Sequence, residues 1–213
     1  MPLNDFLSPY GARKTESGTL KTASIATVAA LKALAAVHPA HVHGNVVMVD
    51  ADQSEWYYHA TSALTGDDTL VVTPTNASGR WLRKPGTVDL KLAIGHAMAD
   101  GATLLTMPAG ARMLVRRAYW EITTAFEGGT SSAIGIAGPS PHNTAGDILG
   151  GASGDVEATL TAGVKLGTVG ADIAAGVLLK AADTVTFERI TSAFTSGAGF
   201  VHLVGELVLN AGA

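Results

Sequence analysis

The chain has no cysteine among its 213 residues, which excludes a disulfide framework, a thiolate metal site and a cysteine nucleophile. Charged residues make up only 15% of the sequence and aromatic residues 6%, whereas a typical soluble domain is about 25% charged. The formal net charge is −4, so we expect no nucleic-acid partner, because such binding depends on neutralising phosphates. A hydrophobic content of 47% is too high for a disordered chain.

Targeting signals are also lacking. Residues 1–10 contain no basic region followed by an apolar run, so we expect no secretory signal. The most apolar segment, residues 23–37, is shorter than the ~20 residues of a membrane span and contains Lys32. The sequence therefore predicts a protein without a membrane partner.

What the sequence does contain is small residues: 36 Ala, 25 Gly and 23 Thr. A turn-rich stretch at residues 73–79 and the segment Lys84-Pro85-Gly86 suggest a domain boundary. We expect an extended arm at 1–22, a small α+β module at 23–86 and a β-sandwich domain at 87–213.

The arm has no clear hydrophobic period, yet it contains four isolated large apolar residues, Leu3, Phe6, Leu7 and Tyr10. A free tail is usually more polar than this. Two interpretations remain open: a frayed terminus, or an anchor that becomes ordered on a partner through these four side chains.

The small module begins with a helical pattern. Residues 24–37 predict a short helix capped by Ser24 or Thr22 and ended at His38-Pro39. Four strand candidates follow, joined by turn-forming residues, at 45–49, 55–60, 69–73 and 80–83. We expect the helix to pack on a small antiparallel meander.

From Val88 onward the hydrophobic period is two. The alternation predicts that Leu114, Ala118, Trp120 and Ile122 share one face of a strand at 112–124, interrupted by Arg116, and that His202 and Glu206 lie opposite the apolar face of the last strand. Further strands are expected at 103–107, 132–137, 176–180 and 184–190. Short strands separated by Gly and Pro turns are typical of an antiparallel β-sandwich or jelly roll, and their low charge indicates burial between subunits.

No segment carries a recognisable catalytic pattern. Residues 150–154 (Gly-Gly-Ala-Ser-Gly) lack the spacing of a serine elbow, so a flexible loop is the better interpretation. Asp67-Asp68 and the pair Asp50 and Asp52 lack the further oxygen ligands of a calcium loop, and we interpret them as turn residues. We therefore expect no enzyme activity and no cofactor.

Histidines and aromatic residues were the remaining candidates for a site. His41 and His43 lie on the same side of an extended segment, but two ligands are too few for a tight metal site unless a threefold axis supplies six. We expect loop histidines in solvent and no metal. Trp56, Tyr57 and Tyr58 are interpreted as packing residues of a strand, with sugar stacking as the alternative.

Two stretches resemble bacteriophage virion proteins. The order of residues 24–34, 44–49, 56–58 and the closing Gly79-Arg80-Trp81 is similar to a module near the N-termini of phage tail spikes, fibres and head fibres. Residues 99–111, 115–130, 132–137 and 182–187 resemble the β-sandwich of head-decoration (cement) and head-fibre proteins. Together the two resemblances cover about 85% of the chain.

The resemblance implies a homotrimer without catalysis that binds the major capsid protein on the capsid exterior of the virion, after assembly in the host cytoplasm. No small-molecule substrate is implied. We expect the arm and the small module to lie on the shell, with Leu3, Phe6, Leu7 and Tyr10 contacting it, and the sandwich to trimerise; the reverse polarity stays open. The alternatives are a tail-fibre, spike or baseplate component that adheres to host glycans, a glycan hydrolase, or a structural protein outside phages.

Overall fold

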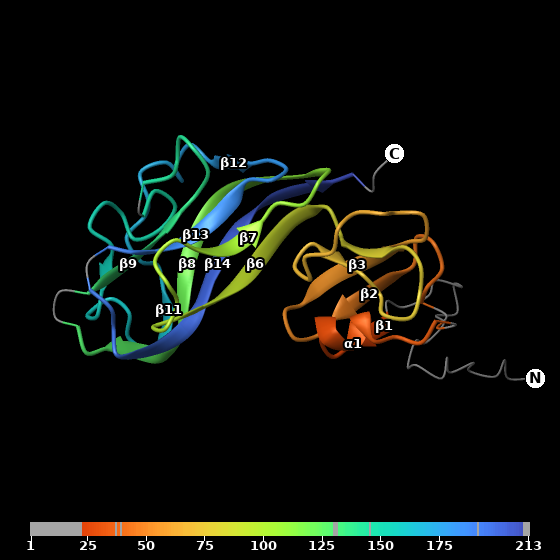
Figure 1. The fold of residues 1–213 in the computed structure, drawn as a ribbon, viewed down its shortest axis with the longest axis horizontal. Coiled ribbons are helices and arrows are strands. Elements are labelled where there is room, and N and C mark those ends of the chain that lie inside the picture. The colour runs from red at the N-terminus through yellow and green to blue at the C-terminus, as the bar shows by residue number, and fades with distance from the viewer. Residues whose placement is uncertain are drawn as a thin grey trace, which may run out of the picture. The chain divides into compact units, whose positions relative to one another are not determined.

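The structure is a computed structural model that describes residues 23–36, 38, 40–129, 132–144, 146–190 and 192–210. The expected arm, with Leu3, Phe6, Leu7 and Tyr10, lies outside the described residues. The chain divides into two compact units (Figure 1). The N-terminal unit runs to Lys84 and includes Leu209 onward, and the C-terminal unit is Pro85–Val208.

The N-terminal unit is built on one five-stranded sheet with the strand order β1-β2-β3-β5-β4. Its strands are β1 (Ala23–Ile25), β2 (Val46–Val49), β3 (Ser54–His59), β4 (Val71–Val72) and β5 (Arg80–Arg83). Four of these were predicted, although β4 is shorter than the 69–73 expected. These four strands pair antiparallel, as expected, and β1, which was not predicted, adds to the sheet edge parallel to β2.

The helix of this unit, α1 (Val28–Lys32), has five residues. Thr27 is its N-cap, and the Thr27 hydroxyl oxygen accepts a hydrogen bond of 3.1 Å from the Ala30 amide. The predicted helix at 24–37 with a Ser24 or Thr22 cap is therefore wrong. The reason is that Ser24 belongs to β1, where it pairs with Met48 of β2. This pairing is a tertiary contact, and it overrides the local helical propensity of residues 23–25.

The core of the N-terminal unit forms between α1 and the sheet. Leu31 of α1 is fully buried, as are Trp56 of β3 and Trp81 of β5, and Tyr58 is 3% exposed. Trp56 and Tyr58 are thus packing residues, as their position in a strand predicts, whereas Tyr57 on the other face of β3 is only partly buried.

The C-terminal unit consists of two antiparallel sheets (Figure 1). The four-stranded sheet has the order β10 (Asp155–Val156), β9 (Ala133–Ala137), β13 (Thr184–Arg189) and β7 (Ala102–Thr106). The five-stranded sheet has the order β11 (Gly163–Lys165), β8 (Ala111–Glu127), β14 (Ser196–Leu209) and β6 (Gly86–Gly95), and β12 (Val177–Leu179) also pairs with β8. The predicted mainly β, antiparallel sandwich class is confirmed.

Strand β8 corrects one detail of the predicted faces. Ala118, Trp120 and Ile122 are buried as expected, but Leu114 is not on their side. Arg116 and Arg117 are both exposed, so the alternation shifts by one residue between the two halves of the strand. Leu114 consequently lies on the outer side, opposite Leu178 of β12. A strict period of two cannot be extended across such an irregularity.

Glycines set the close approach of β14 to β8. A Cβ atom on Gly205 would lie 2.1 Å from the Leu114 carbonyl oxygen, and one on Gly199 would lie 2.4 Å from that of Glu121. No other residue fits at these two positions without moving a strand. β14 therefore needs glycine at these two positions, although glycine has a low propensity for β-strands.

Candidate interaction surface on the five-stranded sheet

The side chains of β6, β8 and β14 that face away from the core form the outer face of the five-stranded sheet. The register between β14 and β6 determines which residues share this face: His202 pairs with Lys91, and Val204 pairs with Asp89. At its centre lies a group of five polar residues that we name the His202 cluster: Asp89, Lys91, Tyr119, Glu121 and His202.

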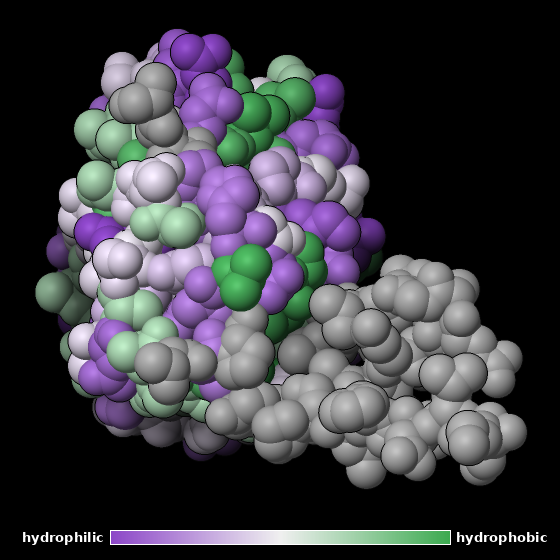
Figure 2. Space-filling view, turned by 90° about the vertical axis from the view of Figure 1, so that its right-hand side faces the viewer, coloured by the Kyte–Doolittle hydropathy of each residue, from purple (hydrophilic) through white to green (hydrophobic). Residues whose placement is uncertain are grey.

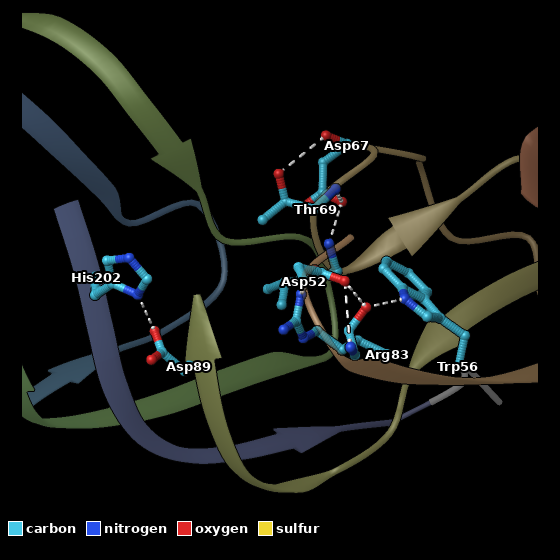
Figure 3. Close-up of polar contacts among 9 residues, drawn as sticks. Asp52, Trp56, Asp67, Thr69, Arg83, Asp89 and His202 are labelled. Atoms are coloured by element: carbon cyan, nitrogen blue, oxygen red, sulfur yellow. Dashed lines mark hydrogen bonds and ion pairs between the residues drawn. The ribbon is translucent and has the colours of Figure 1, made fainter. Parts of the chain in front are cut away.

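His202 is held by two carboxylates from neighbouring strands. Its Nδ1 lies 2.8 Å from Asp89 Oδ1, a contact visible in Figure 3, and its Nε2 lies 2.8 Å from Glu121 Oε2. The Tyr119 ring stacks on the imidazole with centroids 4.4 Å apart and planes 11° apart. His202 is 8% exposed as a result, although it lies opposite the apolar face of its strand as predicted.

The rest of the cluster is also paired. Lys91 Nζ lies 2.7 Å from Glu121 Oε2 and 4.2 Å from the centroid of the Phe200 ring. The hydrogen bonds from Lys91 and His202 hold the pKa of Glu121 below its usual value. Burial, together with the hydrogen bond from the Tyr119 hydroxyl to Asp89, raises the pKa of Tyr119 to about 12. These groups satisfy one another and connect three strands, so the cluster stiffens the face.

A stripe of arginines runs beside the cluster on β8. Arg112, Arg116 and Arg117 are all exposed. Within the described part of the chain, no carboxylate lies within 4.0 Å of these guanidinium groups. Arg117 instead lies over the Tyr119 ring, 5.0 Å from its centroid. The outer face therefore presents positive charge that the described residues do not neutralise.

Three exposed aliphatic residues lie at the edge of the same sheet: Val164 of β11, Leu166 directly after β11 in the chain, and Leu178 of β12. Of the other large hydrophobic residues that are exposed among the described residues, Val156 belongs to β10 of the four-stranded sheet and Val169 bridges to Leu149. Val164 pairs with Glu121 and Leu178 with Leu114, so β11 and β12 extend the outer face at its edge. Elsewhere, on the face shown in Figure 2, hydrophobic residues occur as separate patches among hydrophilic ones.

Sequence reasoning missed one of the two strands of this edge. β12 was predicted, at 176–180, but β11 has only three residues and gives too short a pattern. A signal was present, since Val164 and Leu166 alternate with Lys165 and Gly167.

The aspartates that were interpreted as turn residues do serve turns. Asp67 Oδ1 accepts hydrogen bonds from the amides of Thr69, Leu70 and Val71, at 3.0, 2.8 and 2.8 Å. Asp52 accepts a hydrogen bond from the Ser54 hydroxyl at 2.5 Å, and its other oxygen lies 3.2 Å from Arg83 (Figure 3). The Ser54 hydroxyl in turn accepts from the Trp56 indole at 2.6 Å.

The predicted position of the loop histidines in solvent is wrong for His41. Its ring centroid lies 4.9 Å from that of Tyr58 and 5.6 Å from that of Trp81, and both ring nitrogens are buried without a hydrogen-bond partner. His43 packs against His59 instead, with centroids 4.5 Å apart. Among the described residues, no group of three or more His, Cys, Asp or Glu side chains is placed to hold a metal ion.

No known family model, curated protein or solved structure matches this chain. No helix within the described ranges has the length and apolar character to cross a membrane.

Proposed function

We propose that this chain is a structural protein of a phage virion that binds the outer surface of the assembled capsid as a homotrimer and holds neighbouring capsomers together. Two independent supports carry the proposal. The first is the order of sequence motifs shared with phage head-decoration and fibre modules. The second, structural support is the exposure of three aliphatic residues, Val164, Leu166 and Leu178, along the β11–β12 edge of the five-stranded sheet.

Leaving this edge in water is costly. Val164, Leu166 and Leu178 are 67%, 71% and 44% exposed, and complete burial of one such side chain is worth about 1.5–3 kcal/mol. A second copy that covered this edge would recover much of that free energy. In a closed ring of three copies, the β11–β12 edge of each copy would be covered by one neighbour. Each copy would in turn cover the same edge of its other neighbour.

The polarity of attachment follows from the two-part sequence. The C-terminal unit holds the trimer together, and the N-terminal unit with the arm lies on the shell, where Leu3, Phe6, Leu7 and Tyr10 contact the major capsid protein. Three arms on one trimer bind several shell subunits at once, which raises avidity without any new type of contact.

Co-sedimentation with expanded capsids tests this function. Purified full-length chain is expected to pellet with the shells, and a variant lacking residues 1–22 is expected to stay in the supernatant while remaining trimeric. A full-length chain that never pellets with shells would refute the proposal. Equal binding by the truncated variant would refute the stated polarity.

Glycan adhesion by a tail component is the less favoured function. It requires aromatic rings open to a sugar, but Trp56 is fully buried and Tyr58 is 3% exposed. Two of the three rings that suggested sugar stacking are therefore part of the core, and the third, Tyr57, is partly buried.

A further inference from the structure

Strand β6 is an edge strand of the five-stranded sheet, and its side away from β14 has no strand partner among the residues that the structure describes. β6 pairs with β14 along its whole length without a register shift, and the His96 amide continues the ladder by donating to the Gly197 carbonyl oxygen at 2.9 Å. Backbone groups alternate between the two sides of a strand, so those of Thr87, Lys91 and Ala93 point toward the open edge. β6 therefore presents a regular row of donors and acceptors that another strand can pair with.

The side chains of β6 do not shield this edge. Charged side chains commonly protect an edge strand from pairing, but those of β6 turn inward across the sheet. Asp89 contacts His202 of β14 at 2.8 Å (Figure 3), and Lys91 reaches Glu121 of β8 at 2.7 Å. Ala93, further along the strand, has only a methyl group. The backbone of β6 is thus left without a charged cover.

The opposite edge of the same sheet is also open. It is formed by β11 and β12, which both pair with β8, and no further strand pairs with either of them within the described ranges. On the outer face this edge exposes Val164, Leu166 and Leu178. One copy therefore has a bare backbone edge on one side of the sheet and an aliphatic edge on the other.

The two open edges run in opposite directions. β12 is antiparallel to β8, and β14 is antiparallel to β6. Gly205 of β14 lies against Leu114 of β8, and Gly199 lies against Glu121, so β8 and β14 are antiparallel as well. A rotation about an axis along the strands would therefore bring β6 of one copy antiparallel to β12 of the next, which continues the pattern of the whole sheet.

Charge on the outer face differs between the two edges. On the side of β11 and β12, strand β8 carries the exposed Arg112, Arg116 and Arg117. On the side of β6, the exposed acidic residues are Asp89 of β6 and Glu206 of β14. Contact between unlike edges would bring these opposite charges together, whereas contact between like edges would bring like charges together.

We propose that the β6 edge of one copy pairs antiparallel with the β11–β12 edge of the next, so that three five-stranded sheets join into one closed ring. This inference rests on the trimer proposed above and identifies the surface that covers its aliphatic edge. Each copy offers each edge once, as a head-to-tail ring requires. The backbone of β6 supplies the hydrogen bonds, and the aliphatic side chains of the neighbouring edge lose their contact with water.

The order of residues across the sheet predicts which positions meet. Val164 and Leu178 pair with opposite ends of β8. Through the contacts of the two β14 glycines with β8, Val164 lies level with Ala93 across the sheet, and Leu178 lies level with Thr87. A rotation axis along the strands preserves these levels. Ala93 of one copy therefore meets Val164 of the next, and Thr87 meets Leu178.

Cysteine cross-linking tests this arrangement in the full chain, which has no cysteine of its own. Two double variants place cysteines where the edges should meet: Ala93→Cys with Val164→Cys, and Thr87→Cys with Leu178→Cys. The matched control, Ala93→Cys with Leu178→Cys, uses the same exposed positions but joins opposite ends of the two edges. Within one copy the two edges are three strand spacings apart, roughly 14 Å, which is too far for a disulfide.

After oxidation, we expect both double variants to run as covalent species of three copies on a non-reducing gel, and the control to run as a single chain. Lack of cross-linking in both double variants would overturn the proposal, and a second pair keeps the test valid if one variant fails to fold. Cross-linking of the control would also overturn it, as would dimers of Ala93→Cys alone, which would show that two β6 edges meet.

The same experiment separates this contact from the proposed function. Wild-type chain that sediments as three copies, with neither double variant cross-linked, would overturn the pairing of these edges and leave the trimer in place. Cross-linked rings that form as expected, with wild-type chain that does not pellet with capsids, would support the pairing and refute the function on the shell.

Discussion

Tyr119 stacks on His202 across two neighbouring strands, and the imidazole, which also contacts Asp89 and Glu121, is 8% exposed. The phenol hydroxyl donates to Asp89 at 2.8 Å, and Asp89 also contacts the imidazole. The stack therefore fixes both the ring and one of its two carboxylate partners, and it connects β8, β14 and β6 on the outer face.

Removing that stack should weaken the C-terminal unit. We expect Tyr119→Ala to lower the free energy of unfolding by about 2 kcal/mol, because it removes the ring contact and one charged hydrogen bond. Tyr119→Phe keeps the ring and should cost only about 1 kcal/mol. Urea unfolding followed by circular dichroism measures both. Equal losses for the two variants would show that the stack contributes nothing.

Glu121 should contribute to stability against acid. Its pKa is lowered by the hydrogen bonds from Lys91 and His202, so its contribution is present above its ordinary pKa of 4.5 and is lost as the pH falls through the lowered value. Unfolding curves between pH 6 and pH 3 should show the wild type converging on Glu121→Gln as the pH drops. A constant gap between the two chains across this range would contradict the assignment.

Asp155 is the buried carboxylate that connects the two sheets. It is 1% exposed, and it accepts hydrogen bonds from the Trp120 indole at 2.7 Å and from the Thr168 amide and hydroxyl at 3.0 and 2.7 Å. Asp155→Asn places an amide donor against these donors and should cost about 2–3 kcal/mol. Thermal unfolding measures it, with Glu157→Gln as the control at a nearby acid. A loss no larger than that of the control would mean that the network is dispensable.

The edge of the five-stranded sheet should control self-association. A chain carrying Val164→Asp, Leu166→Asp and Leu178→Asp is expected to sediment as a monomer of 21.6 kDa, whereas we expect the wild type to sediment as three copies. Each position is exposed in the single chain, so folding should be preserved. Val42→Asp, a residue 57% exposed in the N-terminal unit, is the matched control and should remain trimeric. A wild type that is monomeric at every concentration would contradict the account of this edge.

The sequence was informative wherever burial alternates cleanly along a strand. β13 was predicted within one residue, because its buried Val185 and Phe187 alternate with less buried side chains. β5 was predicted with its observed bounds, although the three residues Trp81–Arg83 are all buried. The short helix was overestimated because residues 23–25 carry a helical pattern but pair as a strand with β2, and such pairing is a tertiary contact that no local window contains.

The interaction surface was harder to predict for the same reason. The His202 cluster draws its residues from β6, β8 and β14, which are far apart along the chain, so its members meet only through strand register. Leu114 was assigned to the wrong face because Arg116 and Arg117 shift the alternation within β8. His41 was placed in solvent because a loop position adjoining a proline gives no indication that Tyr58 and Trp81 will cover the ring.

Cryo-electron microscopy of the virion whose genome encodes this chain tests the proposed attachment to the outside of the head. We expect three copies of the chain around a threefold position on the outside of the head, with the β11–β12 edge of each copy covered by its neighbour. Density for the chain on the tail, or an isolated copy whose β11–β12 edge faces water, would contradict it.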